Sequence, residues 1–228
     1  DPGRSVRQML GFRGLKGMQG KQLRFLGIRN FAHRAVSVTS CLDTSFRNLY
    51  FDKIQYGITV SNSRNTFFED VECYNSRHPV VPASWSDNIY VDGLSGRNNQ
   101  GIMDAHPAFN IHYNHVVASM DGSSNLRSVG GSVRNSIFVS RKEIRSGPYF
   151  QTVALVKPEI YQDYEFVMEN VRWEASRPMS IRHSGKVTLR DVRNVNLQGE
   201  DVGVNVGKGV NELILDNTMP GRIRVADV

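Results

Sequence analysis

A short pattern of apolar, polar and turn-forming residues recurs along the chain and constrains its fold more than any other feature. The pattern occupies residues 46–49, 68–71, 91–94, 113–116, 168–171 and 189–192. Its last apolar residues, taken as anchors, are Leu49, Val71, Leu94, Val116 and Ile137, at intervals of 22, 23, 22 and 21 residues. Intervals of 34 and 21 residues lead on to Val171 and Val192. A fixed period of about 22 residues indicates a repeat architecture.

Three repeat architectures have units of this length, and the residues favour one of them. Hairpin repeats would need frequent Asn-Gly or Asp-Gly turns, which occur only at residues 92–93 and 121–122. Leucine-rich repeats need a Leu-x-x-Leu-x-Leu frame that no segment shows. We therefore predict an all-β fold, a single-stranded parallel β-helix of about eight coils of roughly 22 residues, on the order of 40 Å long at about 4.8 Å per coil.

The spacing of the repeats also predicts how the chain is divided. Residues 1–20 are expected to form a lead-in or cap, residues 21–195 the coils, and residues 196–228 a terminal coil and C-terminal cap. The long interval exceeds the period by 34 − 22 = 12 residues, which predicts an inserted loop at about residues 141–163. Asn or Asp precedes most anchors, at Asn48, Asp70, Asn170 and Asp191, and suits an internal ladder at a turn.

Charge and composition narrow the classes of partner. The 228 residues include 28 Lys and Arg against 22 Asp and Glu, a net charge of +6 spread along the chain, which favours polyanionic partners. The basic residues form no stripe with interleaved aromatics, so we expect no nucleic-acid binding. No apolar run is long enough for a membrane span, and we expect no membrane insertion. The two cysteines, Cys41 and Cys73, signal neither a disulfide framework nor a zinc site.

Four of the six histidines fall between residues 78 and 115, on coils predicted to be neighbours. We predict that His78, Asp104 and His106 transfer protons as catalytic residues, and that Arg77 binds an acidic group of the substrate. The alternative is that such residues cap turns. A metal site is a third interpretation, but no helix fixes the spacing of His and Asp; we predict no metal and no cofactor. No pair of carboxylates stands out as that of a glycosidase.

Residues at equal distances from the anchors should stack into columns. Phe67, Tyr90 and His112 form one column that strand alternation points outward, and His33, Tyr56, His78 and Gly101 form another. Aromatic rings on a solenoid face can bind carbohydrate. We predict that Tyr56, Tyr90, Trp85 and His112 contribute to substrate binding; the alternative is that these rings cover the core.

Coils of about 22 residues with Asn and Asp at turns and an outward cluster of His, Arg and Asp resemble the right-handed parallel β-helix of the pectin-lyase-like superfamily. Within it, the adjacent Arg77 and His78 and the Asp-x-His of residues 104–106 are similar to motifs of bacteriophage tailspike and appendage proteins. The Asn-Thr-Asp, Asp-Asp, Gly-His-Gly and Arg-Ile-Lys motifs of the pectin hydrolases are missing from the sequence, and the calcium-binding Asp cluster of the pectate lyases cannot be placed.

The resemblance implies a phage tailspike-like depolymerase, a polysaccharide lyase or glycoside hydrolase, that binds and cleaves a bacterial surface polysaccharide such as capsule or lipopolysaccharide. It also implies a homotrimer of parallel β-helices, located in the virion tail or secreted, with an attachment segment before Asp1. Two alternatives stay open: a non-catalytic receptor-binding or structural virion protein, and a teichoic-acid phosphodiesterase.

Overall fold

The fold is all-β among the residues that the structure describes. This computed structural model describes residues 8–16, 23–121, 124–140, 149–151, 164–182, 185–196, 198–207, 209–218 and 223–226. Their strands, in chain order, are β1 (Gln8–Arg13), β2 (Leu23–Thr39), β3 (Leu42–Ser61), β4 (Arg64–Tyr74), β5 (His78–Ala83), β6 (Asp87–Asn99), β7 (Asp104–Asn114), β8 (Val117–Met120), β9 (Asn125–Ser140), β10 (Tyr149–Gln151), β11 (Glu165–Glu174), β12 (Met179–Arg182), β13 (Gly185–Val195), β14 (Val204–Gly207), β15 (Val210–Asp216) and β16 (Ile223–Ala226).

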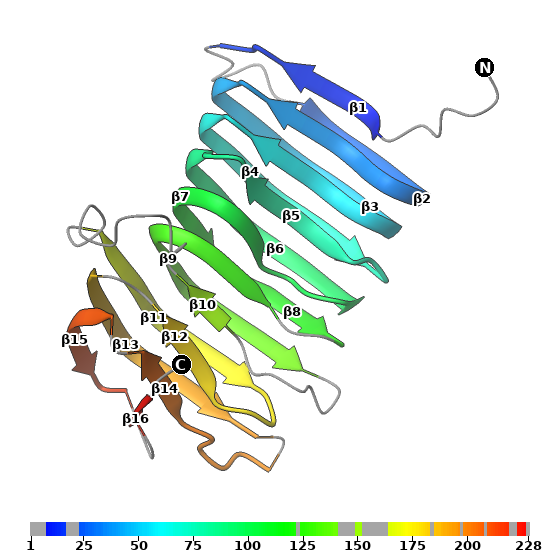
Figure 1. The fold of residues 1–228 in the computed structure, drawn as a ribbon. Coiled ribbons are helices and arrows are strands. Elements are labelled where there is room, and N and C mark those ends of the chain that lie inside the picture. The colour runs from blue at the N-terminus through cyan, green and yellow to red at the C-terminus, as the bar shows by residue number, and fades with distance from the viewer. Residues whose placement is uncertain are drawn as a thin grey trace.

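These strands stack as a parallel β-solenoid of about eight turns, consistent with a right-handed β-helix. Each pairing between named strands is parallel, from β1 on β2 at one end to β14 on β16 at the other. Figure 1 shows the coils following one another along a rod, from the blue N-terminal strand to the red C-terminal one. The predicted fold class and the spacing of roughly 22 residues are confirmed.

Apolar residues of successive coils stack inside the rod. Leu49 pairs with Val71 and Val71 with Leu94, and all three are buried, as strand alternation requires of the inward position. Aromatic rings extend the same stacking: Phe138 and Trp173, from β9 and β11, lie with their ring centroids 4.3 Å apart. The core is therefore one continuous column of side chains, in which each coil contacts only its neighbours.

The corner before each anchor is built by a residue in the left-handed region of backbone conformation. Its φ is 55° at Asn48, 54° at Asp70, 52° at Asn170 and 51° at Asp191. Asn and Asp tolerate this conformation better than other non-glycine residues, which is why they recur there.

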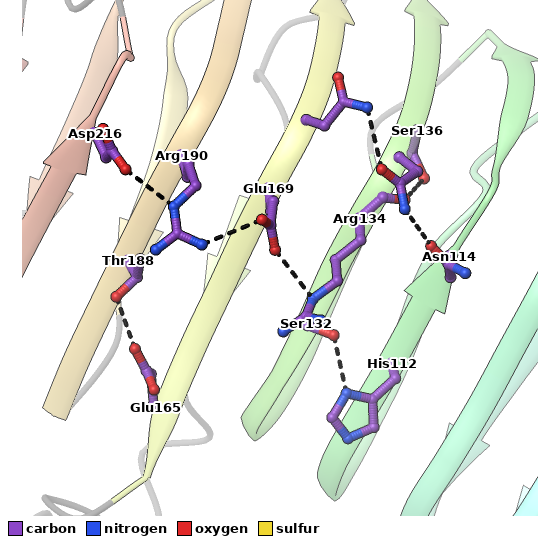
Figure 2. Close-up of polar contacts among 12 residues, drawn as sticks. His112, Asn114, Ser132, Arg134, Ser136, Glu165, Glu169, Thr188, Arg190 and Asp216 are labelled. Carbon is purple, nitrogen blue, oxygen red and sulfur yellow. Dashed lines mark hydrogen bonds and ion pairs between the residues drawn. The ribbon is translucent and has the colours of Figure 1, made fainter.

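Side-chain amides link the same corner from coil to coil. Asn114 donates to Asp92 Oδ1 (3.1 Å), Asn135 to Asn114 Oδ1 (3.0 Å) and Asn170 to Asn135 Oδ1 (3.1 Å), a ladder that is partly visible in Figure 2. Of the four residues predicted to form an internal ladder, Asn170 takes part in these bonds, and the ladder lies on the exposed edge of the corner rather than inside the rod. Inside the rod, hydroxyl groups have the linking role: Ser63 Oγ accepts from the Cys41 amide (3.1 Å) and Ser86 Oγ from the Ser63 amide (3.3 Å).

One anchor predicted from the sequence is wrong. Ser136, not Ile137, pairs with Val171 in the anchor column, and Ile137 is 45% exposed. Asn135 has a φ of 47° and forms the corner, so the residue directly after it must point inward. The Ser136 hydroxyl is satisfied there, because it accepts from the Val116 amide (3.0 Å) and donates to the Arg134 carbonyl. The short polar side chain thus replaces an apolar anchor.

A second difference concerns the column through Tyr56. Tyr56 pairs with His78, as predicted, but Arg34 and not His33 is its partner on the other side. An irregularity in the pairing of β2 with β3 between Phe31 and Arg34 shifts the register by one residue. A shift of one residue turns the other face of a strand outward, so a count from the anchor cannot predict the residues beyond the shift.

The ends and the insertion contribute strands to the stack. β1 lies within the predicted lead-in, and β14, β15 and β16 within the predicted terminal part. Within the predicted loop, β10 pairs with β9 and β12 and so fills one strand position of its coil. Residues 141–148 and 152–163, the rest of that loop, lie outside the described residues.

Candidate functional site

Asp104 and His106 project from the same outer face of β7. The residue between them, Ala105, is fully buried, so alternation along the strand places its two neighbours on the outside. Asp104 Oδ2 lies 3.7 Å from His106 Nε2. The imidazole and the carboxylate are therefore close enough for the charge of one to stabilise that of the other.

His78 reaches the same carboxylate from the neighbouring coil. A bridge between Val80 and Met103 places β5 beside the start of β7, and His78 Nε2 lies 3.5 Å from Asp104 Oδ2. His78 is only 8% exposed. The structure thus brings together the three residues for which the sequence predicts proton transfer, and one carboxylate serves two imidazoles. We call His78, Asp104 and His106, with Arg77 and Tyr56 beside them, the Asp104 cluster.

The environment of His78 favours its neutral form. Burial lowers the pKa of its imidazole, and the nearby charges of Arg77 and His106 lower it too, whereas Asp104 and a backbone hydrogen bond with Gly101 act to raise it. Its Nδ1 atom is buried and makes no hydrogen bond with a described residue. A neutral His78 adds no positive charge that would compete with His106 for the Asp104 carboxylate.

His106 is the accessible imidazole of the cluster. Its side chain is 46% exposed, against 11% for that of His78 and 13% for that of Asp104. A side chain that exchanges protons with a polymer must be accessible to that polymer. Among His78, Asp104 and His106, only His106 meets this requirement in the observed conformation. Predicted as equivalent, the two histidines differ in burial and hence in what they can do.

Arg77 and Tyr56 border the cluster. The Arg77 guanidinium carbon lies 5.5 Å from the centre of the Tyr56 ring, and this ring stacks on that of His78 at 5.8 Å. Because Arg77 is exposed, its charge faces solvent beside the imidazole. The arrangement can attract an anionic group to the edge of the site.

Tyr90 and His112 belong to another column. With Phe67 they form a stack across β4, β6 and β7, with ring centroids 4.8 and 4.6 Å apart. The column is outward, as predicted, but these rings stack on one another and each is only partly exposed. His112 Nδ1 also lies 2.9 Å from Ser132 Oγ (Figure 2), and burial lowers the pKa of its imidazole to about 4. The structure does not bring these two residues into the Asp104 cluster.

Trp85 lies at the other end of β5 from His78, at the corner that leads to β6. Half of it is exposed, and its ring stacks on that of Phe109 at 5.8 Å. Trp85 therefore lies apart from the Asp104 cluster and beside Arg64 and Asp87. No sequence motif indicates this placement. The available signal was the 23-residue interval between Val71 and Leu94.

Other chemistry in the described part of the chain is limited. No group of three or more His, Cys, Asp or Glu side chains is arranged there to hold a metal ion. Cys41 and Cys73 are buried and free, and burial raises the pKa of the Cys73 thiol to about 12. Among the described residues, no helix is long and apolar enough to cross a bilayer.

Comparison with known proteins gives no relative: no family model, no curated protein and no solved structure matches this chain.

Proposed function

We propose that the protein binds an acidic polysaccharide along the outer face of the solenoid and cleaves it at the Asp104 cluster. The observation that carries the proposal is the single, nearly buried carboxylate of Asp104 between a buried imidazole and an exposed one. A partly exposed base oriented by a buried carboxylate is the arrangement that activates histidine in many enzymes.

Each residue of the cluster has a distinct role in the proposal. His106 takes a proton from the substrate, and Asp104 orients its ring and stabilises the imidazolium that forms. His78 is a positioning residue: it is buried, its imidazole favours the neutral form, and it holds Asp104 without neutralising it. Arg77 binds a carboxylate of the polymer, consistent with the net charge of +6.

The cluster fits an elimination better than a hydrolysis. Glycoside hydrolases usually need two carboxyl groups roughly 5 to 10 Å apart, whereas the ion pairs of this site converge on one carboxylate. In an elimination, His106 removes the proton next to the carboxylate of a uronic acid, and the electron pair forms the C4–C5 double bond. The glycosidic C4–O bond breaks, and the leaving oxygen takes up a proton from His106 or solvent. Water is not consumed.

The setting of this activity is also proposed. A β-solenoid with this cluster suits a tailspike-like depolymerase of the pectin-lyase-like superfamily, acting on capsule or lipopolysaccharide from a virion tail or in the extracellular space. A trimer of parallel solenoids would present three such faces to one polymer surface.

The test measures products from uronate-containing bacterial polymers, namely alginate, xanthan, gellan and hyaluronan, and from purified capsule. We expect a rise in ultraviolet absorbance from an unsaturated uronate, lost in His106→Ala and kept in His115→Ala. His115 is a matched control, because it also pairs with a carboxylate, Asp92, at 2.8 Å but lies at an exposed corner.

Other results would contradict the proposal in different ways. New reducing ends without unsaturation would replace elimination by hydrolysis. Release of phosphate esters from teichoic acid would replace the substrate class, and binding without any product would favour a non-catalytic module. Full activity of His106→Ala would remove the cluster from the reaction.

A further inference from the structure

The corner that holds Trp85 has one residue more than the same corner of the preceding coil. Along this corner, Ser63 Oγ accepts from the Cys41 amide, 22 residues earlier in the chain, and Ser86 Oγ accepts from the Ser63 amide, 23 residues earlier. Just before the corner the interval is still 22, since Ser61 pairs with Ala83. One residue has therefore been added between Ala83 and Ser86, where the chain has Ser84 and Trp85. In solenoids, residues added to a repeat emerge on the surface, often on a binding face.

Trp85 combines an uncommon backbone conformation with a half-exposed side chain. Its φ is 64°, directly after Ser84 with a φ of 49°, and a bulky side chain is rarely found in this region. Trp85 is 50% exposed, so about half of this large residue faces solvent although its ring packs on Phe109. Strained residues of this kind cluster at ligand-binding sites.

A hollow lies beside the indole. It is shallow and open, with a volume of about 380 Å³, and its lining includes Trp85, Ser40, Leu42, Asn62, Arg64 and Asp87. Arg64 Nε lies 3.4 Å from Asp87 Oδ2, and the Arg64 side chain is 65% exposed, so its charge faces the solvent at this place. One large ring thus stands next to several hydrogen-bonding groups.

We infer that this hollow, with Trp85 as its platform, is a saccharide-binding site separate from the Asp104 cluster. The indole offers apolar area to the C–H face of a sugar ring, and hydroxyl, amide and charged groups offer hydrogen bonds to its hydroxyls. Arg64 is paired with Asp87 on one side, and the exposed part of its guanidinium can bind a carboxylate of an acidic sugar. A protein partner would need a much larger contact than this hollow, and the other exposed large apolar residues, Val117, Ile137 and Leu215, lie on other strands.

The distance along the coil makes the two sites distinct. β5 separates His78 from the Trp85 corner, roughly 20 Å of extended chain at about 3.3 Å per residue. A short saccharide occupies one site only, whereas a polymer can bind both and gain affinity from the second contact. The inference rests on the proposed function for the class of ligand, but binding at Trp85 needs no cleavage.

Tryptophan fluorescence gives a direct test. The chain has two tryptophans, and Trp173 is fully buried, so acrylamide quenching reports mainly on Trp85. Quenching is measured on the His106→Ala protein, which keeps the polymer intact, with alginate, xanthan, gellan, hyaluronan and neutral dextran. We expect at least one uronate polymer to protect Trp85 from quenching, and dextran to protect it less.

Variants then separate a binding role from a structural one. Trp85→Ala and Arg64→Ala should each weaken binding of that polymer about tenfold or more in calorimetry, with an unchanged circular dichroism spectrum. Leu215→Ala, which removes another exposed apolar side chain, should bind as the parent does.

The results distinguish the two proposals. Protection of Trp85 by a polymer that the wild-type protein does not cleave would support this site and contradict the proposed reaction. A polymer that is cleaved, does not protect Trp85 and binds Trp85→Ala as tightly as the parent protein would contradict this site alone. If none of the polymers protects Trp85, the inference is wrong.

Discussion

Asp104 and His106 stand two residues apart on β7, and the Asp104 Oδ2 and His106 Nε2 atoms lie 3.7 Å apart on its outer face. His78 holds the same carboxylate from the neighbouring coil. The proposed acid–base site therefore depends on stacking as well as on strand alternation, since neither strand alone supplies both imidazoles.

Asp104→Asn tests whether the carboxylate orients and stabilises His106. The amide has almost the same shape but no charge, so we expect the rate of polymer cleavage to fall about 100-fold or more while binding changes little. Initial rates over a range of polymer concentrations measure this. A variant with a normal rate but a weaker apparent affinity would show that Asp104 binds substrate instead.

His112 should make the protein less stable in mild acid. Its pKa is lowered to about 4 in the folded protein, whereas the unfolded chain has the ordinary value near 6.5. Between these values the unfolded state binds a proton that the native state does not. The contribution of His112 to the free energy of unfolding is therefore fully present above about pH 6.5. It is lost as the pH falls toward 4, by up to about 3 kcal/mol.

His112→Phe checks this prediction, because it keeps an aromatic ring next to Tyr90 and removes the titration. Urea unfolding between pH 7 and pH 4 should then show a smaller loss of stability than in the wild type. Ser132→Ala is the control: it removes the same hydrogen bond to His112 but leaves the imidazole, so the pH dependence should persist. Equal slopes in wild type and His112→Phe would contradict the prediction.

Charged side chains from four successive coils form a ladder of ion pairs whose strength should depend on salt. Glu169 Oε1 lies 3.1 Å from Arg190 Nη1 and Glu169 Oε2 3.7 Å from Arg134 Nε, and Arg190 Nε lies 3.1 Å from Asp216 Oδ2 (Figure 2). Hydrogen bonds to Glu169, and then to Asp216, raise the pKa of Arg190.

Glu169→Gln should lower the melting temperature by a few degrees at low salt, because two arginines lose a shared carboxylate. The difference should shrink at about 1 M salt, where the Debye length is about 3 Å. Glu174→Gln, which affects only a pair with Arg172 on its own strand, should have a smaller effect. A salt-independent loss would point to packing as the cause.

Close stacking of two coils explains Gly96. A Cβ atom at this position would lie 2.1 Å from the carbonyl oxygen of Cys73, which belongs to the paired strand. Gly96→Ala should therefore cost about 1 to 3 kcal/mol of unfolding free energy, or more. The new Cβ is fixed to its own backbone and would meet a backbone oxygen, so neither atom can move aside without moving a strand. Gly27→Ala is the control, since its Cβ would have nothing within 4 Å, and should change the stability by less than about 0.5 kcal/mol. Chemical denaturation measures both.

Deletion of Trp85 should leave the fold intact. The preceding coil passes this corner without the extra residue, from Asn62 directly to Ser63, so the deletion restores the 22-residue spacing and removes a strained φ. We expect an unchanged or slightly higher melting temperature, measured by calorimetry. A large destabilisation would mean that the residue is structural and would weaken the argument for a binding site.

Much of the architecture was predictable because a solenoid repeats its geometry. The anchors Leu49, Val71 and Leu94 have the same inward position, so their spacing alone predicts parallel stacking and the outward column of Phe67, Tyr90 and His112. Ser136 was predictable too, from the corner rule: Asn135 has the corner conformation, and the next residue points inward whatever its polarity. Attention to apolar residues alone gives Ile137 instead.

By itself the sequence determined the period, the parallel solenoid and the residues that meet near Asp104, because strands stacked at about 4.8 Å bring equal positions of neighbouring coils together. Only the tertiary structure decided which imidazole is accessible, that Arg34 rather than His33 pairs with Tyr56, and that the corner of Trp85 holds the added residue. These outcomes depend on shifts of one residue at corners and irregular pairings. Such shifts depend on which backbone N–H and C=O groups find hydrogen-bond partners inside the rod. A period of about 22 residues does not predict them.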